Sequence, residues 1–180
     1  LHPYISLDEA SKALIIQPGN YFIDDNIIIP AGYTLKISPA VILTFSSKAY
    51  ILSFGNLKSI GTKSNPVVMK SANSGENWYG IISIGNGSQT TKLQHTLISN
   101  VSSFQSENWS LTGGITMYKN KYVDINSSIF TNNSSEDFIN IIHSNFSIKD
   151  TKIQSAISDA FDADFSDGVI LNYSFIDIGA

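Results

Sequence analysis

Short segments in which β-branched or aromatic residues alternate with polar ones recur along most of the chain. Tyr122–Asn126 and Gly168–Asn172 are two examples. A hydrophobic period of two predicts a strand with one buried face. Turns rich in Gly, Asn and Ser separate these segments, without an amphipathic helical pattern between them. The pattern therefore predicts an all-β chain of short strands.

The strand segments also repeat at a nearly constant spacing. Asp159 follows Asp137 by 22 positions, and Asp162 follows Asn140 by the same interval. Short strands at a fixed period of roughly 20 to 30 residues are typical of a β-solenoid, whose coils bury their inner faces by stacking on one another. We expect about seven coils, near residues 13–32, 33–55, 56–80, 81–114, 115–138, 139–160 and 161–180.

Two stretches interrupt the repeat and predict surface loops. The first is Val101–Thr112, which is rich in Ser and contains Trp109. The second is Ser71–Asn77. Insertions in a solenoid coil are expected to lie outside the stacked strands.

The two ends of the chain differ in their local signals. Ser6 and Glu9 have the spacing of a capping box, which predicts a short helix over about Leu7–Ala13 that would close one end of the solenoid. We therefore expect one domain over residues 1–180, with a cap over 1–14 and coils over 15–180. At the other end, Phe175–Ala180 stops within a coil, so we expect either further coils or docking on another chain there.

Composition narrows the possible functions. The formal net charge is −4, and all eleven basic residues are Lys. This balance argues against a nucleic-acid-binding protein or a binder of anionic membranes. The absence of Cys excludes disulfide scaffolds, Cys-ligated zinc and thiol nucleophiles. No apolar run approaches the length of about 18 residues needed for a membrane span, so membrane insertion is not expected.

Several motifs carry a resemblance to a known group of proteins. Ile28–Leu35, Ser53–Leu57 and Asn65–Val67 resemble the opening coils of bacterial right-handed parallel β-helix proteins of the pectin-lyase-like superfamily. Trp78–Ile81 and Asp159–Phe165 are similar to coils of a bacterial surface subset that is sometimes found beside spore-coat-type kinase domains. The resemblance implies a right-handed parallel β-helix, a secreted or cell-surface location, and polysaccharide as a partner.

The catalytic motifs of that superfamily do not transfer to this sequence. Pectate lyases use an Arg base, and this chain has no Arg. Polygalacturonases use an Asp pair with Gly-His-Gly and Arg-x-Lys motifs, of which only an Asp pair, Asp24-Asp25, is present. Alginate epimerases carry Asp-Pro-His-Asp, whereas Asp159–Asp162 has Phe161 in place of the His. The sequence thus contains no complete superfamily active site.

An acidic cluster near the end of the chain is the strongest candidate for chemistry. Alternation in Phe161–Phe165 places the Phe and Ala side chains inward and places Asp162 and Asp164 on one outward face, roughly 6.6 to 7 Å apart. That separation overlaps the roughly 6.5 to 9.5 Å expected between the two carboxyl groups of inverting glycosidases. With Asp159, the two acids are also a candidate calcium site, the only cofactor that the sequence suggests. The alternative is that these acids occupy ordinary solvated turns and outer strand positions.

Other residues are candidates for supporting roles. His143 lies one coil before the acids and is a candidate general acid or base. The candidate ligand-binding residues combine aromatic rings, an amine and an amide, and are Trp78, Tyr118, Lys119 and Asn140. Structural roles are equally open: Trp78 would anchor the start of a coil, and Lys119 would lie in a solvated turn.

Three functions follow from these observations. The leading interpretation is a non-catalytic β-helix module of a secreted or cell-surface bacterial protein that binds carbohydrate. The second is a fragment of a polysaccharide-active enzyme, a lyase, hydrolase or epimerase, that uses the Asp cluster as an acid pair or a calcium site. The third is an assembly module that docks through its open C-terminal coil.

Overall fold

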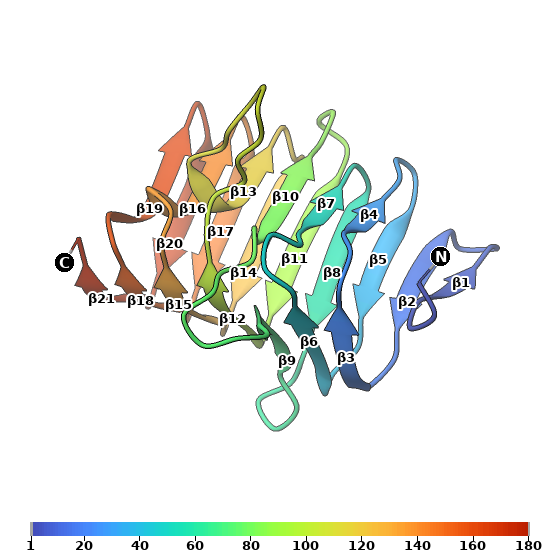
Figure 1. Ribbon diagram of the computed structural model, residues 1–180. Coiled ribbons are helices and arrows are strands. Elements are labelled where there is room, and N and C mark those ends of the chain that lie inside the picture. Colours follow the sequence, from blue (N-terminus) through green and yellow to red (C-terminus); the bar gives the residue numbers. More distant parts are fainter. Residues whose placement is uncertain (1, 180) are drawn as a thin grey trace.

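The computed structural model describes residues 2–179, and every regular element in that range is a β-strand. Leu1 and Ala180, the two ends of the predicted domain, lie outside it. The strands form three sheets, and Figure 1 shows strands stacked side by side along the molecule from its N-terminal to its C-terminal end. The prediction of an all-β chain is confirmed. No helix in residues 2–179 is long and apolar enough to cross a membrane.

The three sheets contain eight, six and seven strands. Sheet 1 has the order β1 (Ser6–Asp8), β2 (Ala13–Ile16), β5 (Thr34–Ile37), β8 (Asn56–Ile60), β11 (Thr90–Gln94), β14 (Tyr122–Asn126), β17 (Asn145–Lys149) and β20 (Asp167–Leu171). Sheet 2 consists of β4 (Ile27–Ile29), β7 (Ile51–Ser53), β10 (Ile81–Ile84), β13 (Gly113–Tyr118), β16 (Asp137–Ile142) and β19 (Asp159–Asp164). Sheet 3 consists of β3 (Gly19–Ile23), β6 (Val41–Phe45), β9 (Val67–Ser71), β12 (Thr96–Val101), β15 (Ile129–Asn133), β18 (Lys152–Ala156) and β21 (Ser174–Ile178).

The order of strands shows how the chain runs. From β2 onward, each strand pairs in parallel with the strand three elements later, so the chain visits the three sheets in turn and then stacks on its previous turn. Parallel pairing leaves both faces of a strand available for packing, and here the inner faces of the three sheets meet. This topology is consistent with the predicted β-helix-like solenoid.

The core consists of side chains that repeat at the same position in consecutive turns. One inward column on sheet 2 contains Ile residues that are in register and fully buried: Ile27, Ile51, Ile81, Ile115 and Ile139. Burial of one such side chain contributes about 1.5 to 3 kcal/mol. Because each turn offers the next the same surface, one packing arrangement extends along the whole stack.

An aromatic pair fills the core where sheet 3 turns toward sheet 2. Trp78 is fully buried, and its ring stacks on Phe45 with centroids 4.0 Å apart and an interplanar angle of 5°. The indole Nε1–H donates a hydrogen bond to the Ser99 carbonyl at 3.0 Å. The Trp78 ring therefore has both of the contacts that a buried indole requires, an apolar face and a polar partner.

The N-terminal cap is a β-hairpin, so the prediction of a helix over Leu7–Ala13 is wrong. β1 pairs antiparallel with β2, and the Ser6 hydroxyl donates to the Ile15 carbonyl at 3.2 Å instead of capping a helix. Asp8 accepts hydrogen bonds from the Ala10 and Ser11 N–H groups and from the Ser11 hydroxyl, which closes the turn. These bonds, with the Ser11 hydroxyl first, hold the pKa of Asp8 below its ordinary value. The hairpin covers the backbone edge of β2, which a helix would have left without ladder partners.

The two predicted loops lie between strands, as expected. Residues 72–77 follow β9, and residues 102–112 connect β12 to β13. The second loop folds back on the molecule because Phe104 packs edge-on against Tyr50 and Tyr79. Trp109 in turn packs on Phe104 at 4.4 Å. Aromatic contacts thus hold this loop against the molecule.

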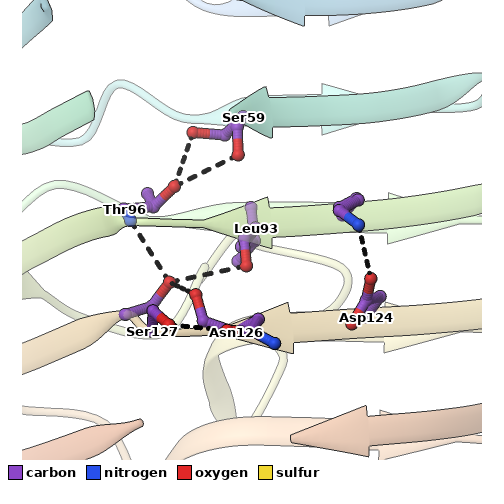
Figure 2. Close-up of polar contacts among 8 residues, drawn as sticks. Ser59, Leu93, Thr96, Asp124, Asn126 and Ser127 are labelled. Atoms are coloured by element: carbon purple, nitrogen blue, oxygen red, sulfur yellow. Dashed lines mark hydrogen bonds and ion pairs between the residues drawn. The ribbon is translucent and has the colours of Figure 1, made fainter. Parts of the chain in front are cut away.

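Hydroxyl groups connect consecutive turns at the corner between sheet 1 and sheet 3 (Figure 2). The side chains of Ser59 and Thr96 are buried and share a hydrogen bond of 2.8 Å between their oxygens. Thr96 also bonds to the next turn, because its N–H donates to the Ser128 hydroxyl at 3.2 Å. The corner's polar atoms are therefore satisfied by the neighbouring turns instead of by water.

We expect replacement of Trp78 by Ala to lower the free energy of unfolding by about 3 to 5 kcal/mol, the usual range for a buried aromatic residue. The matched control is Trp109→Ala, because Trp109 is 45% exposed on the loop, and it should cost less than about 1 kcal/mol. Urea unfolding followed by circular dichroism measures both values. Equal losses for the two variants would contradict the assignment of Trp78 to the core.

Candidate functional site

The predicted acidic cluster lies on the last two strands of sheet 2. In the register of β16 and β19, Asp137 is opposite Asp159, and Asn140 is opposite Asp162. Ile142 is opposite Asp164, the last residue of β19. Phe161 and Ala163 pack against the core, so the alternation that predicted Asp162 and Asp164 on one outward face is confirmed. The side-by-side placement of the acids with Asp137 and Asn140 is also as expected.

Asn140 holds the long loop against sheet 2. Its side-chain Nδ2 donates to the Asp137 carboxylate at 3.0 Å and to the Thr112 hydroxyl at 2.9 Å. Both Asn140 and Asp137 are buried, although they stand on the outer face of the sheet. The Oδ1 of Asn140 has no hydrogen-bond partner among residues 2–179. The structure thus places Asn140 beneath Thr112 instead of on an open ligand-binding surface.

Asp162 has the most perturbed carboxyl group of the cluster. Partial burial raises its pKa above the ordinary value, and the negative charges of Asp164, Asp137 and Asp159 act in the same direction. A bond of 2.8 Å from the Ala163 N–H to the Asp162 carboxylate opposes this rise. A carboxyl group with a raised pKa beside an exposed acid is the arrangement that general acid–base catalysis uses. This geometry is compatible with an acid pair.

The acids do not form a preformed metal cage. Among residues 2–179, no three His, Cys, Asp or Glu side chains converge in a way that could hold a metal ion. Calcium binding by Asp159, Asp162 and Asp164 stays a prediction, and it would require movement of these side chains or ligands from elsewhere.

A second group of side chains stands at the corner between sheet 2 and sheet 1. Lys119, His143 and Phe165 occupy the same position in three consecutive turns, each with a left-handed backbone of φ 50°. The Lys119 N–H donates to the Ile142 carbonyl at 3.0 Å, and the His143 N–H donates to the Asp164 carbonyl at 2.9 Å. Backbone bonds between turns therefore align these three residues.

Their side chains form a continuous row with Tyr118. The rings of His143 and Phe165 stack with centroids 5.0 Å apart and an interplanar angle of 16°. Tyr118 contacts His143 edge-on at 6.1 Å, and the Lys119 Nζ lies 5.3 Å from the centre of the Tyr118 ring, within the usual range of cation–π contacts. We call Tyr118, Lys119, His143 and Phe165 the corner column.

A polar pocket of about 310 Å³ opens beside the corner column. Its walls come from four consecutive turns and are formed by Gly87, Asn120, Lys121, His143, Ser144, Asn145 and Phe165. The floor is fixed by a row of hydrogen bonds, in which the Asn120 N–H donates to the Ser144 hydroxyl and the Ser144 N–H donates to the Ser166 hydroxyl. Lys121, His143 and Asn145 are exposed and supply polar groups to the pocket.

The structure brings together only some of the residues predicted to form a site. Tyr118, Lys119 and His143 lie in one column, and the backbone of His143 contacts that of Asp164. Trp78 is buried in the core, which excludes it from a ligand-facing surface. The prediction that Phe165 points inward is wrong, because its left-handed backbone breaks the alternation and leaves the ring 83% exposed and stacked on His143. The signal that would have found this exposed ring is its position, 22 residues after His143 in the repeat.

No family model, curated protein or solved structure matches the chain.

The raised pKa of Asp162 predicts a pH-dependent contribution to stability. The folded protein holds the Asp162 proton more tightly than the unfolded chain does, so this contribution is complete below the ordinary pKa of 3.8 and is lost as the pH rises through the raised value. We expect Asp162→Asn to be more stable than the wild type at neutral pH, with a difference that shrinks in acid. Thermal unfolding from pH 3 to 7 measures this difference in stability. Asp167→Asn is the control for the removal of one charge. If the unfolding temperatures of the wild type and of Asp162→Asn changed in parallel with pH, the assignment of a raised pKa to Asp162 would be contradicted.

Proposed function

We propose that this chain is a non-catalytic carbohydrate-binding module and that the corner column is its binding surface. The proposal includes the finer fold assignment, a right-handed parallel β-helix of about seven coils of the pectin-lyase-like kind. It also includes a place on a secreted or cell-surface bacterial protein. The observation that carries the function is the exposed aromatic row beside a polar pocket.

The exposed face of Phe165 is the central element of this proposal. One face of its ring stacks on His143, while the side chain as a whole is 83% exposed. A sugar ring presents apolar C–H groups on one face and hydroxyl groups around its rim, so it suits an aromatic face with polar groups nearby. Lys121 and Asn145 are the polar groups within the same pocket.

The backbone at Phe165 has the positive φ that Lys119 and His143 have at the same position in the two preceding turns. A bulky residue with positive φ is uncommon because its Cβ is crowded, and such strain costs about 1 to 3 kcal/mol. Phe165 has φ 50° and buries little of its ring. Its packing therefore offers little to offset the strain, whereas Gly or Asn would adopt this backbone more easily.

An enzymatic role is the second candidate, and it rests on Asp162. The raised pKa of that carboxyl group next to the exposed Asp164 supports an acid pair in a polysaccharide-active enzyme. Assembly through the C-terminal coil is the third candidate. It is supported by large apolar side chains that are exposed on β20, β21 and the turn between them: Val169, Leu171, Tyr173, Phe175 and Ile176.

We expect the protein to bind at least one member of a panel of neutral and acidic polysaccharides, measured by isothermal titration calorimetry with and without Ca²⁺. Phe165→Ala should weaken that binding about tenfold, since an aromatic stack contributes about 1 kcal/mol or more. Tyr173→Ala is the matched control, because Tyr173 is 54% exposed at a different corner. The affinity of this variant for the polysaccharide should equal that of the wild type.

The same panel separates the candidate functions. The Asp162→Ala, Asp164→Ala double variant should retain binding, and the wild type should release no shortened or unsaturated product. Turnover that disappears in the double variant would replace the proposal with the enzymatic candidate. Absence of binding to every polysaccharide, with and without Ca²⁺, would contradict the proposal of carbohydrate binding.

A further inference from the structure

The first strand of sheet 2 has a backbone edge that faces away from the rest of the sheet. β4 pairs only with β7, through a bond of 3.0 Å from the Ile27 N–H to the Tyr50 carbonyl and one of 2.9 Å from the Phe54 N–H to the Ile29 carbonyl. In a parallel strand, the N–H and C=O of one residue point to one side, and the next residue's point to the other. The Ile28 N–H and C=O therefore point toward the open edge.

The corresponding edge of sheet 1 is covered, whereas β4 and, in sheet 3, β3 are paired on one side only. β1 lies antiparallel on β2 and satisfies its outer backbone groups. Within residues 2–179, no strand lies on the outer edge of β4. A single side chain reaches it: the His2 Nε2–H donates to the Asn26 carbonyl at 3.0 Å, just before the strand. Exposed strand edges are templates for pairing with another chain.

An apolar pocket of about 690 Å³ lies beside this edge. Its apolar walls include Ile5, Leu7, Leu14, Ile28, Pro30 and Tyr33. Leu7 and Ile28 are 40% and 53% exposed, so apolar surface here remains in contact with water. A strand that paired with β4 would place alternate side chains toward this pocket, because side chains alternate between the two faces of a strand.

The wall of this pocket contains one carboxylate, that of Asp25, and one imidazole, that of His2. Asp25 is the only Asp, Glu, Lys or Arg side chain in its wall. The sole ion pair in residues 2–179 joins Lys92 to Asp124, so no Lys neutralises Asp25. After burial, the charges of Asp24 and Asp25 are the next causes that raise the pKa of the nearby Tyr4 to about 12. A ligand with a positive charge at this point would complement the site.

We propose that the β4 edge binds an extended peptide strand from a partner protein, whose alternate Val, Ile or Leu side chains enter the pocket and whose Lys or Arg lies beside Asp25. Backbone bonds to Ile28 supply affinity, and the pocket and Asp25 supply specificity, as in other cases of strand addition to a sheet edge. This site lies at the opposite end of the solenoid from the corner column (Figure 1) and is independent of carbohydrate binding.

The test uses two short fluorescent peptides of alternating Val and Thr, one with Lys at its first position and one with Lys at its last. Fluorescence anisotropy with the full chain should show saturable binding of at least one of them. Ile28→Pro should weaken that binding at least tenfold, because Pro removes the outward N–H without removing a β4–β7 bond. Asp25→Asn should weaken it several-fold and reduce its salt dependence, whereas the control Asp167→Asn should not.

A second measurement uses the wild-type protein, so the test does not depend on whether Ile28→Pro folds. The same peptide with N-methyl groups on alternate residues cannot donate along one edge, and one of the two alternate patterns should abolish binding to the wild-type protein. Failure of both peptides to bind, or equal binding by the N-methylated forms, overturns the proposal. Self-association of the wild type that Ile28→Pro removes would also overturn it, because a second copy would then occupy the edge.

Discussion

The parallel hydrogen-bond ladder between consecutive turns is the constraint on which the rest of the structure depends. It holds each turn in register with the next, so a residue at one position is always beside its counterparts. The inward Ile column of sheet 2 follows directly from this register, and the same alignment allows Ser59 and Thr96 to satisfy each other at a buried corner. Because no turn buries its inner face alone, the ladder and the core stabilise each other.

The same constraint arranges the surface. Left-handed backbone positions recur at the corners, and at one corner they place Lys119, His143 and Phe165 in a row. A strand that is paired on one side only exposes a backbone edge. β1 covers the edge of β2, while the edge of β4 and the apolar side chains of β20 and β21 remain exposed. The proposed ligand and peptide sites thus lie where the repeat turns a corner or stops.

The repeat made most of the fold and part of the site predictable. The 22-residue interval aligned Asp137 with Asp159 and Asn140 with Asp162, as the register confirms. The interval did not predict contacts between residues that lie outside this register. The helical signal of Ser6 and Glu9 is local and yields to the open edge of β2, and Asn140 is buried because Thr112, on a loop 28 residues away, folds over it. The local alternation likewise fails at Phe165, where the left-handed backbone of a corner turns the ring outward.

Amide hydrogen exchange tests the ladder most directly, because it reports the free energy needed to open each backbone hydrogen bond. The account predicts that the amides of the central strands β10, β13 and β16 exchange slowest and together, and that protection falls progressively through β19, β20 and β21. If the central amides exchanged as fast as those of the last turn, the turns would not be held in one cooperative stack, and the account would be contradicted.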